Sequence, residues 1–380
     1  MTAIKAFRQA FFKTTRQGIF FDNASMGPVS PAVTEAMSSC MELRESMPMK
    51  YYQYADRIFP QCRARLAALI HAAPEEIAFT ENVAYGINCA ANALPLSPGD
   101  NVILCDREFS SNVYPWLLLE RTKQVQARII PNDGGGLTVA ALEKYADKRT
   151  RAVSVSSVEF ADGYAADLAA IGQWCKDHGA FFIVDCAQSL GVLPMDVRKY
   201  SIDMMAGLSS KWLLGPFATG FLYVRKALLP QLTPPFVGAD SVTVDVDSTD
   251  YRLKLKPDAS RFETGLPNAP GIAGLNAALG FMEKTGPEAI YAQAWQVSGH
   301  FIHRLYELPV HPALCTASDA SRSTIVSFQT KDTRAAYEYL RSNRIACAYR
   351  CGFIRTGIHG YNTIDEADEV ISVLKKFLSK

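Results

Sequence analysis

The chain has 380 residues, of which 48% are hydrophobic and 20% are charged, and its formal net charge is +1. These fractions are ordinary for a soluble globular protein, and the length predicts two domains. The near-neutral charge gives no reason to expect nucleic acid or an acidic membrane as a partner. No apolar run is long enough to span a bilayer, so we expect a cytoplasmic protein.

The nine cysteines are scattered along the chain, and their odd number does not suit a framework of disulfides. Several, such as Cys89 and Cys186, stand in apolar runs, as reduced buried thiols do. Cys347 and Cys351 are near each other, but metal sites use further ligands. We therefore interpret both as structural thiols and expect no metal.

The first twenty residues interleave basic and aromatic side chains. Lys5 and Arg8 alternate with Phe7, Phe11 and Phe12, and no uninterrupted apolar stretch follows them. This pattern is typical of an amphipathic helix and differs from that of a signal peptide. We expect the helix to pack with the second domain.

Between residues 60 and 225, apolar β-branched segments alternate with amphipathic ones. Strands are expected at 76–80, 101–105, 127–130, 150–156, 181–185, 204–207 and 220–224, and helices at 84–93, 113–122, 139–145 and 168–178. This alternation predicts a mainly parallel sheet covered by helices on both faces. Ligands of such sheets bind beyond the carboxyl ends of the strands, so functional residues are expected just after each strand.

A Pro-rich and then charged region, 228–260, connects this part to a second one. There the pattern predicts helices at 272–284, 287–308 and 364–378, with strands near 323–330 and 345–349. We therefore predict a large α/β domain at 21–255 with a seven-stranded sheet. A smaller α+β domain is expected from 1–20 together with 256–380.

Two strand ends carry residues that are costly to bury without a function. The strand at 181–185 ends in Asp185, whose carboxylate needs a positive partner, although a lone Asp at such a place is more often a helix N-cap. The strand at 204–207 leads through Ser210 to Lys211, a lysine among small and apolar residues. Desolvation lowers the pKa of a lysine amine, which can then form a Schiff base, and the Ser210 hydroxyl suits a phosphate.

Pyridoxal 5′-phosphate (PLP) would meet both needs, because its aldehyde reacts with a lysine and its protonated ring nitrogen pairs with a carboxylate. Its phosphate suits a helix N-terminus, and Asn82, Val83 and Ala84 open the helix that follows the strand at 76–80. Phe109, after the strand at 101–105, stands where it can stack on the ring, although a lone Phe is more often a core residue.

Together these segments resemble the class V aminotransferase family, PLP-dependent enzymes of fold type I. The matching blocks occur in the family's order, at 21–28, 98–116, 185–189, 210–216, 261–268 and 355–363. Because these blocks run through nearly the whole chain, the sequence is identified as a member of the family.

The resemblance implies a role for each matching side chain. Lys211 would form the Schiff base and move the α-proton. Asp185 would pair with the ring nitrogen, Gln188 would bind the phenolic oxygen, and Phe109 would stack on the ring. Arg355 would bind the substrate α-carboxylate in a bidentate pair.

The same resemblance implies which residues bind the cofactor phosphate and which segment meets a second subunit. Ser210 and the backbone of 82–84 would hold the phosphate. Gly265 belongs to a segment that reaches the site of a neighbouring subunit, so a homodimer is implied. Leu266 stands where a threonine often contacts the phosphate across the dimer, which puts that contact in doubt.

Two further departures narrow the chemistry. Phe109 and Ser210 stand where many members have histidine. Cysteine desulfurases of the family carry a nucleophilic cysteine on a loop before the arginine, and the stretch from Arg350 to Arg355 is too short for that loop. Cys351 is therefore not expected to carry sulfur.

Several activities share this machinery. We expect an aminotransferase, with a C–S or C–C lyase or an epimerase as the alternative within the family. A nucleotide-binding dehydrogenase would need a G-x-G-x-x-G turn between a strand and a helix, and the sequence has none. A cofactor-binding protein without turnover is disfavoured by the intact Lys211, Asp185 and Arg355.

Overall fold

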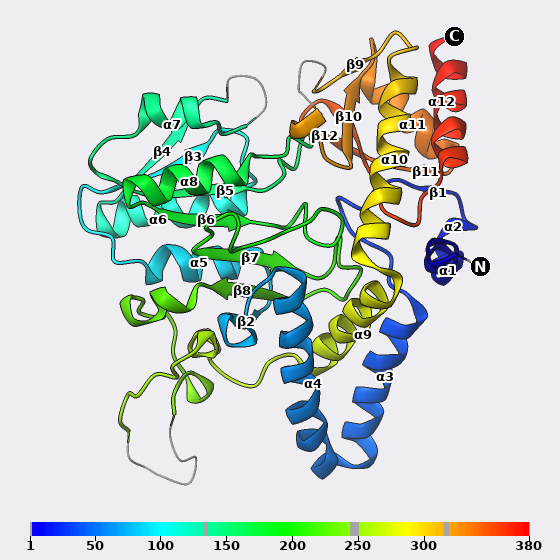
Figure 1. Ribbon diagram of the computed structural model, residues 1–380. Helices are drawn as coiled ribbons and strands as arrows, with labels where there is room; N and C mark the ends of the chain where they lie inside the picture. The colour runs from blue at the N-terminus through cyan, green and yellow to red at the C-terminus, as the bar shows by residue number, and fades with distance from the viewer. Residues whose placement is uncertain (1, 133–135, 244–250, 315–318, 380) are drawn as a thin grey trace.

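The computed structural model describes residues 2–132, 136–243, 251–314 and 319–379. A seven-stranded sheet and a four-stranded sheet form the centres of its two parts (Figure 1). The larger sheet has the order β2-β8-β7-β6-β5-β3-β4. Its strands are β2 Ile77–Thr80, β3 Asn101–Cys105, β4 Gln126–Ile130, β5 Thr150–Ser156, β6 Phe181–Asp185, β7 Met204–Leu208 and β8 Gly220–Val224.

The pairing in this sheet confirms the predicted mainly parallel α/β fold. Strands β4, β3, β5, β6 and β7 run parallel to one another, and β8 runs antiparallel to both β7 and β2. Alternate residues enter two different core clusters: Val153 and Phe182 face one side, and Ala152 and Ile183 face the other. Both faces are therefore buried, beneath helices that include α5 Val83–Ala93, α6 Tyr114–Lys123, α7 Val139–Tyr145 and α8 Leu168–His178.

The smaller sheet is antiparallel, in the order β12-β13-β10-β9. Its strands are β9 His311–Pro312, β10 Ile325–Gln329, β12 Ala348–Arg350 and β13 Phe353–Gly357, and its helices are α10 Pro287–Leu305, α11 Thr333–Ser342 and α12 Ile364–Leu378. The predicted strand at 345–349 is two short strands, because β11 Ile345–Ala346 instead pairs with β1 Ile19–Phe20. The N-terminal segment thus joins this part of the fold, while the exact domain boundaries stay a prediction.

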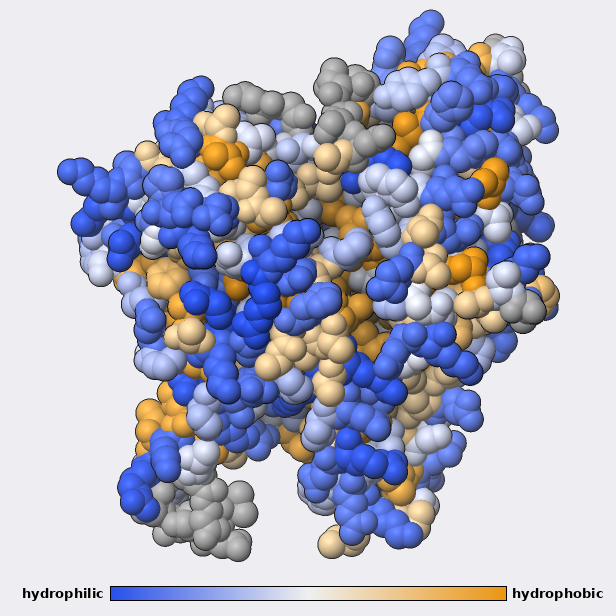
Figure 2. All heavy atoms as spheres, in the orientation of Figure 1, coloured by the Kyte–Doolittle hydropathy of each residue, from blue (hydrophilic) through white to orange (hydrophobic). Residues whose placement is uncertain are grey.

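The amphipathic N-terminal helix is present as α1 Ala3–Ala10, followed by the short α2 Phe12–Thr15. Two long helices, α3 Pro31–Ser46 and α4 Pro48–Leu69, pack with α9 Ala269–Thr285 and project below the larger sheet (Figure 1). Neither α3 nor α4 is among the helices expected from the sequence. Figure 2 shows a mainly hydrophilic face with hydrophobic residues in the hollow between the two parts.

The part of the chain that the structure describes contains no membrane-spanning helix, disulfide or metal-binding group. None of its helices is both long and apolar enough to cross a membrane. Its eight cysteines are all free, and no group of side chains within it is suited to hold a metal ion.

Candidate active site

The carboxyl ends of β6 and β7 bring Asp185 and Lys211 together. These strands are parallel neighbours, with Asp185 opposite Ala206, and Lys211 follows β7 after a short turn. Burial raises the pKa of Asp185 to about 6, against the hydrogen bond from the Ala187 N–H and the charge of Lys211. Burial likewise lowers the pKa of Lys211 to about 8, against the charge of Asp185. A substantial fraction of the amine is therefore neutral near physiological pH.

Phe109 faces the same space. The Nζ atom of Lys211 lies 5.9 Å from the centre of the Phe109 ring. The ring is 43% exposed, and its edge-to-face contact with Phe160 is 5.1 Å between centroids. A large aromatic side chain left open beside a buried amine offers a flat surface for a bound ring.

A buried carboxylate that the sequence analysis missed fixes the Phe109 loop. Glu108 accepts hydrogen bonds from the Ser156 N–H at 2.7 Å, the Ser156 hydroxyl at 2.6 Å and the Asn112 amide at 2.8 Å. Burial raises the pKa of Glu108 to about 7, although these hydrogen bonds lower it. Because Ser156 ends β5, the network ties the loop after β3 to the next strand of the sheet.

Gln188 is held on both sides of its amide. Its Oε1 atom accepts a hydrogen bond from Trp212 Nε1 at 2.9 Å, and its Nε2 atom donates one to the Ala24 carbonyl at 3.0 Å. An amide nitrogen carries two hydrogens, so one remains to bind an oxygen atom of a ligand. This geometry is compatible with the role expected of Gln188.

The residues expected to hold a phosphate offer unused donors. The Asn82 side chain caps α5 by accepting the Tyr85 N–H at 2.9 Å, so it serves the helix itself. The N–H groups of Val83 and Ala84 and the Ser210 hydroxyl donate no hydrogen bond to any residue that the structure describes. Free N–H groups at a helix N-terminus beside a hydroxyl suit an anion.

Arg355 lies on β13 and points toward the N-terminal segment. Its Nη1 and Nη2 atoms donate to the Phe160 carbonyl and the Ser25 hydroxyl, both at 2.8 Å, and Nη2 lies 3.8 Å from Asp22. The buried Nε atom has no acceptor among the described residues. Burial lowers the pKa of Arg355 to about 10, which leaves the group cationic at neutral pH. This guanidinium can therefore still bind a carboxylate.

The connection before Arg355 is as short as the sequence indicated. Arg350 pairs directly with Phe353, so Cys351 and Gly352 form a two-residue turn between β12 and β13. Both turn residues have positive φ, 49° for Cys351 and 84° for Gly352. Such a turn suits a tight hairpin and leaves no room for a longer loop.

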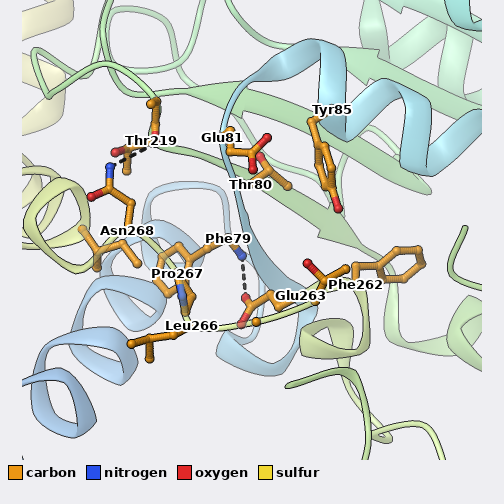
Figure 3. Close-up of a pocket in the computed structure, with 14 residues that line it drawn as sticks. Phe79, Thr80, Glu81, Tyr85, Thr219, Phe262, Glu263, Leu266, Pro267 and Asn268 are labelled. Atoms are coloured by element: carbon orange, nitrogen blue, oxygen red, sulfur yellow. Dashed lines mark hydrogen bonds between the residues drawn. The ribbon is translucent and has the colours of Figure 1, made fainter. Parts of the chain in front are cut away.

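Gly265 and Leu266 are not placed beside Lys211. They line a separate hollow of about 210 Å³ together with residues of β2, α5 and the segment before β8 (Figure 3). Figure 3 shows Glu263 beside this hollow, where its carboxylate accepts the Phe79 N–H at 2.6 Å. Lys211 and Asp185 do not line this hollow, whereas Thr80, Glu81 and Tyr85, which flank the predicted phosphate-binding residues 82–84, do.

The residues around Lys211 fit PLP. Lys211 supplies a buried amine for the aldehyde, and Asp185 supplies a carboxylate that has one oxygen without a described partner. Phe109 supplies the flat surface, and the start of α5 supplies anion-binding donors. Arg355 supplies a buried guanidinium whose Nε atom has no acceptor among the described residues, and a guanidinium is suited to an amino-acid carboxylate.

Comparison with known proteins agrees with this chemistry. The model of the family described as aminotransferase class-V matches residues 19–370. A probable cysteine desulfurase from Pyrococcus abyssi is 29% identical over 386 residues, covering 96% of this chain and 95% of that protein. A probable cysteine desulfurase from Methanothermobacter thermautotrophicus is 34% identical over 276 residues, covering 71% of this chain and 68% of that protein.

Solved structures are similar over nearly the whole chain. The apo structure of a cysteine desulfurase from Thermococcus onnurineus has a TM-score of 0.86 at 26% identity, covering 97% of this chain and 96% of that one. A C-DES mutant with glycine covalently linked to its PLP cofactor has a TM-score of 0.89 at 26% identity, covering 97% and 98%. The expected fold, cofactor and enzyme class are confirmed: this chain belongs to the class V aminotransferase family of PLP-dependent enzymes.

Proposed function

We propose that the protein is a PLP-dependent C–S lyase that acts on cysteine or a cystine-like amino acid, with Lys211 as its catalytic residue. The observation that carries the proposal is full-length similarity to a cystine C–S lyase, solved with its product cysteine persulfide, at a TM-score of 0.86 and 26% identity. Lyase was the alternative in the sequence analysis. The aminotransferase expected first has no specific observation in its favour.

The described residues supply what such a reaction needs. When bound, PLP acts as an electron sink that weakens the bonds to the α-carbon of an amino acid. Arg355 binds the α-carboxylate and thereby orients the α-carbon. The Lys211 Nζ atom would accept the α-proton, and the C–S bond of the substrate would break with its electron pair leaving on sulfur. Asp185 keeps the cofactor ring nitrogen protonated.

The short turn at Cys351 bears on the fate of the sulfur. Between β12 and β13 it leaves no loop that could carry Cys351 between the site and the surface. We therefore propose that the sulfur product leaves directly into solution and is not carried on a cysteine of the enzyme. A cytoplasmic location is part of the same proposal.

A single assay separates a lyase from an aminotransferase. The holoenzyme is mixed with L-cysteine, L-cystine or L-alanine, with and without a 2-oxo acid, and pyruvate, ammonium and sulfide or persulfide are measured. A lyase produces pyruvate, ammonium and a sulfur product without the 2-oxo acid. Turnover that requires the 2-oxo acid would instead establish an aminotransferase.

Two variants complete this assay. Lys211→Ala should abolish turnover, and exposed Lys199→Ala is its matched control. Cys351→Ser should keep the wild-type rate. Loss of activity in Cys351→Ser would contradict direct release of the sulfur product.

We further propose that two copies of the chain associate around the hollow that contains Gly265. Leu266 on its rim is 56% exposed, and Phe217 and Phe236 nearby are 65% and 53% exposed. Neighbouring exposed apolar side chains of this size are typical of an interface. Light scattering after size exclusion should give twice the chain mass, and Leu266→Lys should weaken the dimer. A wild-type monomer at micromolar concentration would contradict this proposal.

A further inference from the structure

Three consecutive carbonyl groups around Lys211 are hydrogen-bonded to residues of other segments. The Ser210 carbonyl accepts the Gly27 N–H at 2.8 Å, and the Lys211 carbonyl accepts the Asn23 amide at 3.3 Å. The Trp212 carbonyl is bonded to His359 Nε2 at 3.0 Å. These partners come from segments far from Lys211 in sequence, so the direction of the lysine side chain depends on long-range contacts.

The tautomer of His359 follows from its two partners. The Gly360 N–H donates to His359 Nδ1 at 2.8 Å, so Nδ1 carries the lone pair and the proton is on Nε2. His359 is fully buried, and burial lowers its pKa to about 4. The ring is therefore neutral at physiological pH and acts as a fixed donor to the Trp212 carbonyl.

Three aromatic rings hold the imidazole in place. The centroids of Trp212, Phe7 and Tyr361 lie 6.0, 5.7 and 5.3 Å from that of His359, with interplanar angles of 17°, 20° and 11°. The Tyr361 hydroxyl also donates to Asn23 Oδ1 at 2.8 Å, and Asn23 is the residue that binds the Lys211 carbonyl. One cluster thus supports two of the three hydrogen bonds to the lysine peptide.

Helix α1 packs against this cluster of aromatic rings. It contributes Phe7, and its Arg8 donates to the Tyr361 carbonyl and to Glu366 at 2.6 and 2.8 Å. The cluster also contacts a second predicted site residue, because Trp212 Nε1 donates a hydrogen bond to the Gln188 Oε1 atom. The N-terminal helix is therefore connected through stacked rings to both Lys211 and Gln188.

We infer that His359 is a positioning residue of the enzyme: it fixes the peptide that carries Lys211, and α1 holds it there through Phe7. This inference rests on the proposed role of Lys211. It also assigns a function to the first residues of the chain, which do not reach the site themselves.

A matched set of holoenzyme variants tests the inference. His359→Phe keeps the stacked ring and removes the hydrogen bond, and His359→Gln keeps a donor without the ring. Phe7→Ala weakens the stack without touching the Lys211 peptide. Leu374→Ala is the control for stability, because Leu374 is buried in a different core cluster, between α12 and the smaller sheet. All are compared at a temperature at which each is fully folded.

Two measurements report on the position of the lysine. In His359→Phe, kcat should fall about 10-fold to 100-fold, as small misplacements of a reacting group do, while KM changes little. The pH midpoint of the absorbance of the lysine-bound cofactor should shift as well. His359→Gln should recover part of both effects, Phe7→Ala should show a smaller shift in the same direction, and Leu374→Ala should show neither.

Wild-type kcat and a wild-type absorbance midpoint in folded His359→Phe would overturn the inference, as would the same changes in Leu374→Ala. If His359→Phe does not fold, the test rests on His359→Gln and Phe7→Ala. A wild-type pH midpoint of the cofactor absorbance in both variants would then overturn the inference. Failure of the proposed role of Lys211 has a different signature, since Lys211→Ala would then keep the absorbance and the activity.

Discussion

The Nζ atom of Lys211 lies 5.9 Å from the centre of the Phe109 ring, although the two residues follow strands that are not neighbours in the sheet. Strands β5 and β6 lie between β3 and β7, and their ends supply Ser156 and Asp185. The Glu108 network holds the Phe109 loop to β5, and the His359 cluster holds the Lys211 peptide. The ring and the amine therefore face each other because two separate supports fix them.

Phe109 should govern cofactor affinity more than chemistry. Replacing it with alanine removes the stacking surface, and an aromatic contact of this kind contributes about 1 kcal/mol, which is about fivefold in affinity. We therefore expect the Kd for PLP, measured by fluorescence titration of the apoenzyme, to rise roughly fivefold in Phe109→Ala. Phe109→Tyr keeps the ring and should retain wild-type affinity. Equal affinity in all three proteins would show that the ring does not stack.

Arg355→Lys should weaken substrate binding, because a lysine cannot make a bidentate contact with a carboxylate. Loss of a charge-assisted contact of about 2–3 kcal/mol predicts a fall in kcat/KM of roughly 100-fold. The fall is measured with the best sulfur amino acid from the substrate screen. The control is Arg341→Lys on the exposed face of α11. Unchanged kcat/KM in Arg355→Lys would mean that the carboxylate binds elsewhere.

The sequence predicted best those site residues that lie at or just after the carboxyl ends of strands. Asp185 ends the buried strand β6, and Lys211 and Phe109 follow the buried strands β7 and β3 within four residues. The sequence marks these strands as continuous apolar runs. It did not reveal Glu108 or Asp22, because their importance comes from partners distant in sequence, Ser156 and Arg355.

The helices that were missed have a similar cause. Helix α3 has few buried residues, Val33 and Cys40, so its apolar pattern is weak in the sequence and its position depends on packing against α9. His359 carried no signal of its own, because a single histidine after a strand shows neither the stack nor the tautomer. The surface that contains Gly265 is the one at which we propose that two copies of the chain meet.

Gly27 lies where the backbone of the N-terminal segment meets the Lys211 peptide. A Cβ atom at this position would lie 2.2 Å from the Lys211 carbonyl oxygen, so either backbone must move. We expect Gly27→Ala to lower the free energy of unfolding by about 1–3 kcal/mol, as overpacking does, and to reduce PLP occupancy. Gly280→Ala on α9 is the control, because its Cβ would meet only the flexible end of Arg65. Full occupancy and wild-type stability in Gly27→Ala would contradict this close approach.

Glu159 should make the protein less stable as pH rises. Its side chain is 1% exposed, neither carboxyl oxygen has a partner among the described residues, and burial raises its pKa well above the ordinary value, as do the charges of Glu108 and Asp162. The unfolded chain releases this proton near the ordinary pKa of about 4.3, whereas the folded chain keeps it to higher pH. Between those two pKa values the folded state binds more protons, so each rise in pH favours unfolding.

Glu159→Gln removes this dependence, because the amide resembles the neutral acid and cannot ionise. Between pH 5 and pH 8, its gain in unfolding free energy over wild type should grow with pH until the pH passes the pKa of Glu159 in the folded protein. The gain is measured by urea unfolding of the holoenzyme across that range. Glu35→Gln, on the exposed side of α3, should show no such trend. A constant difference between Glu159→Gln and wild type at every pH would mean that Glu159 is already ionised in the folded protein.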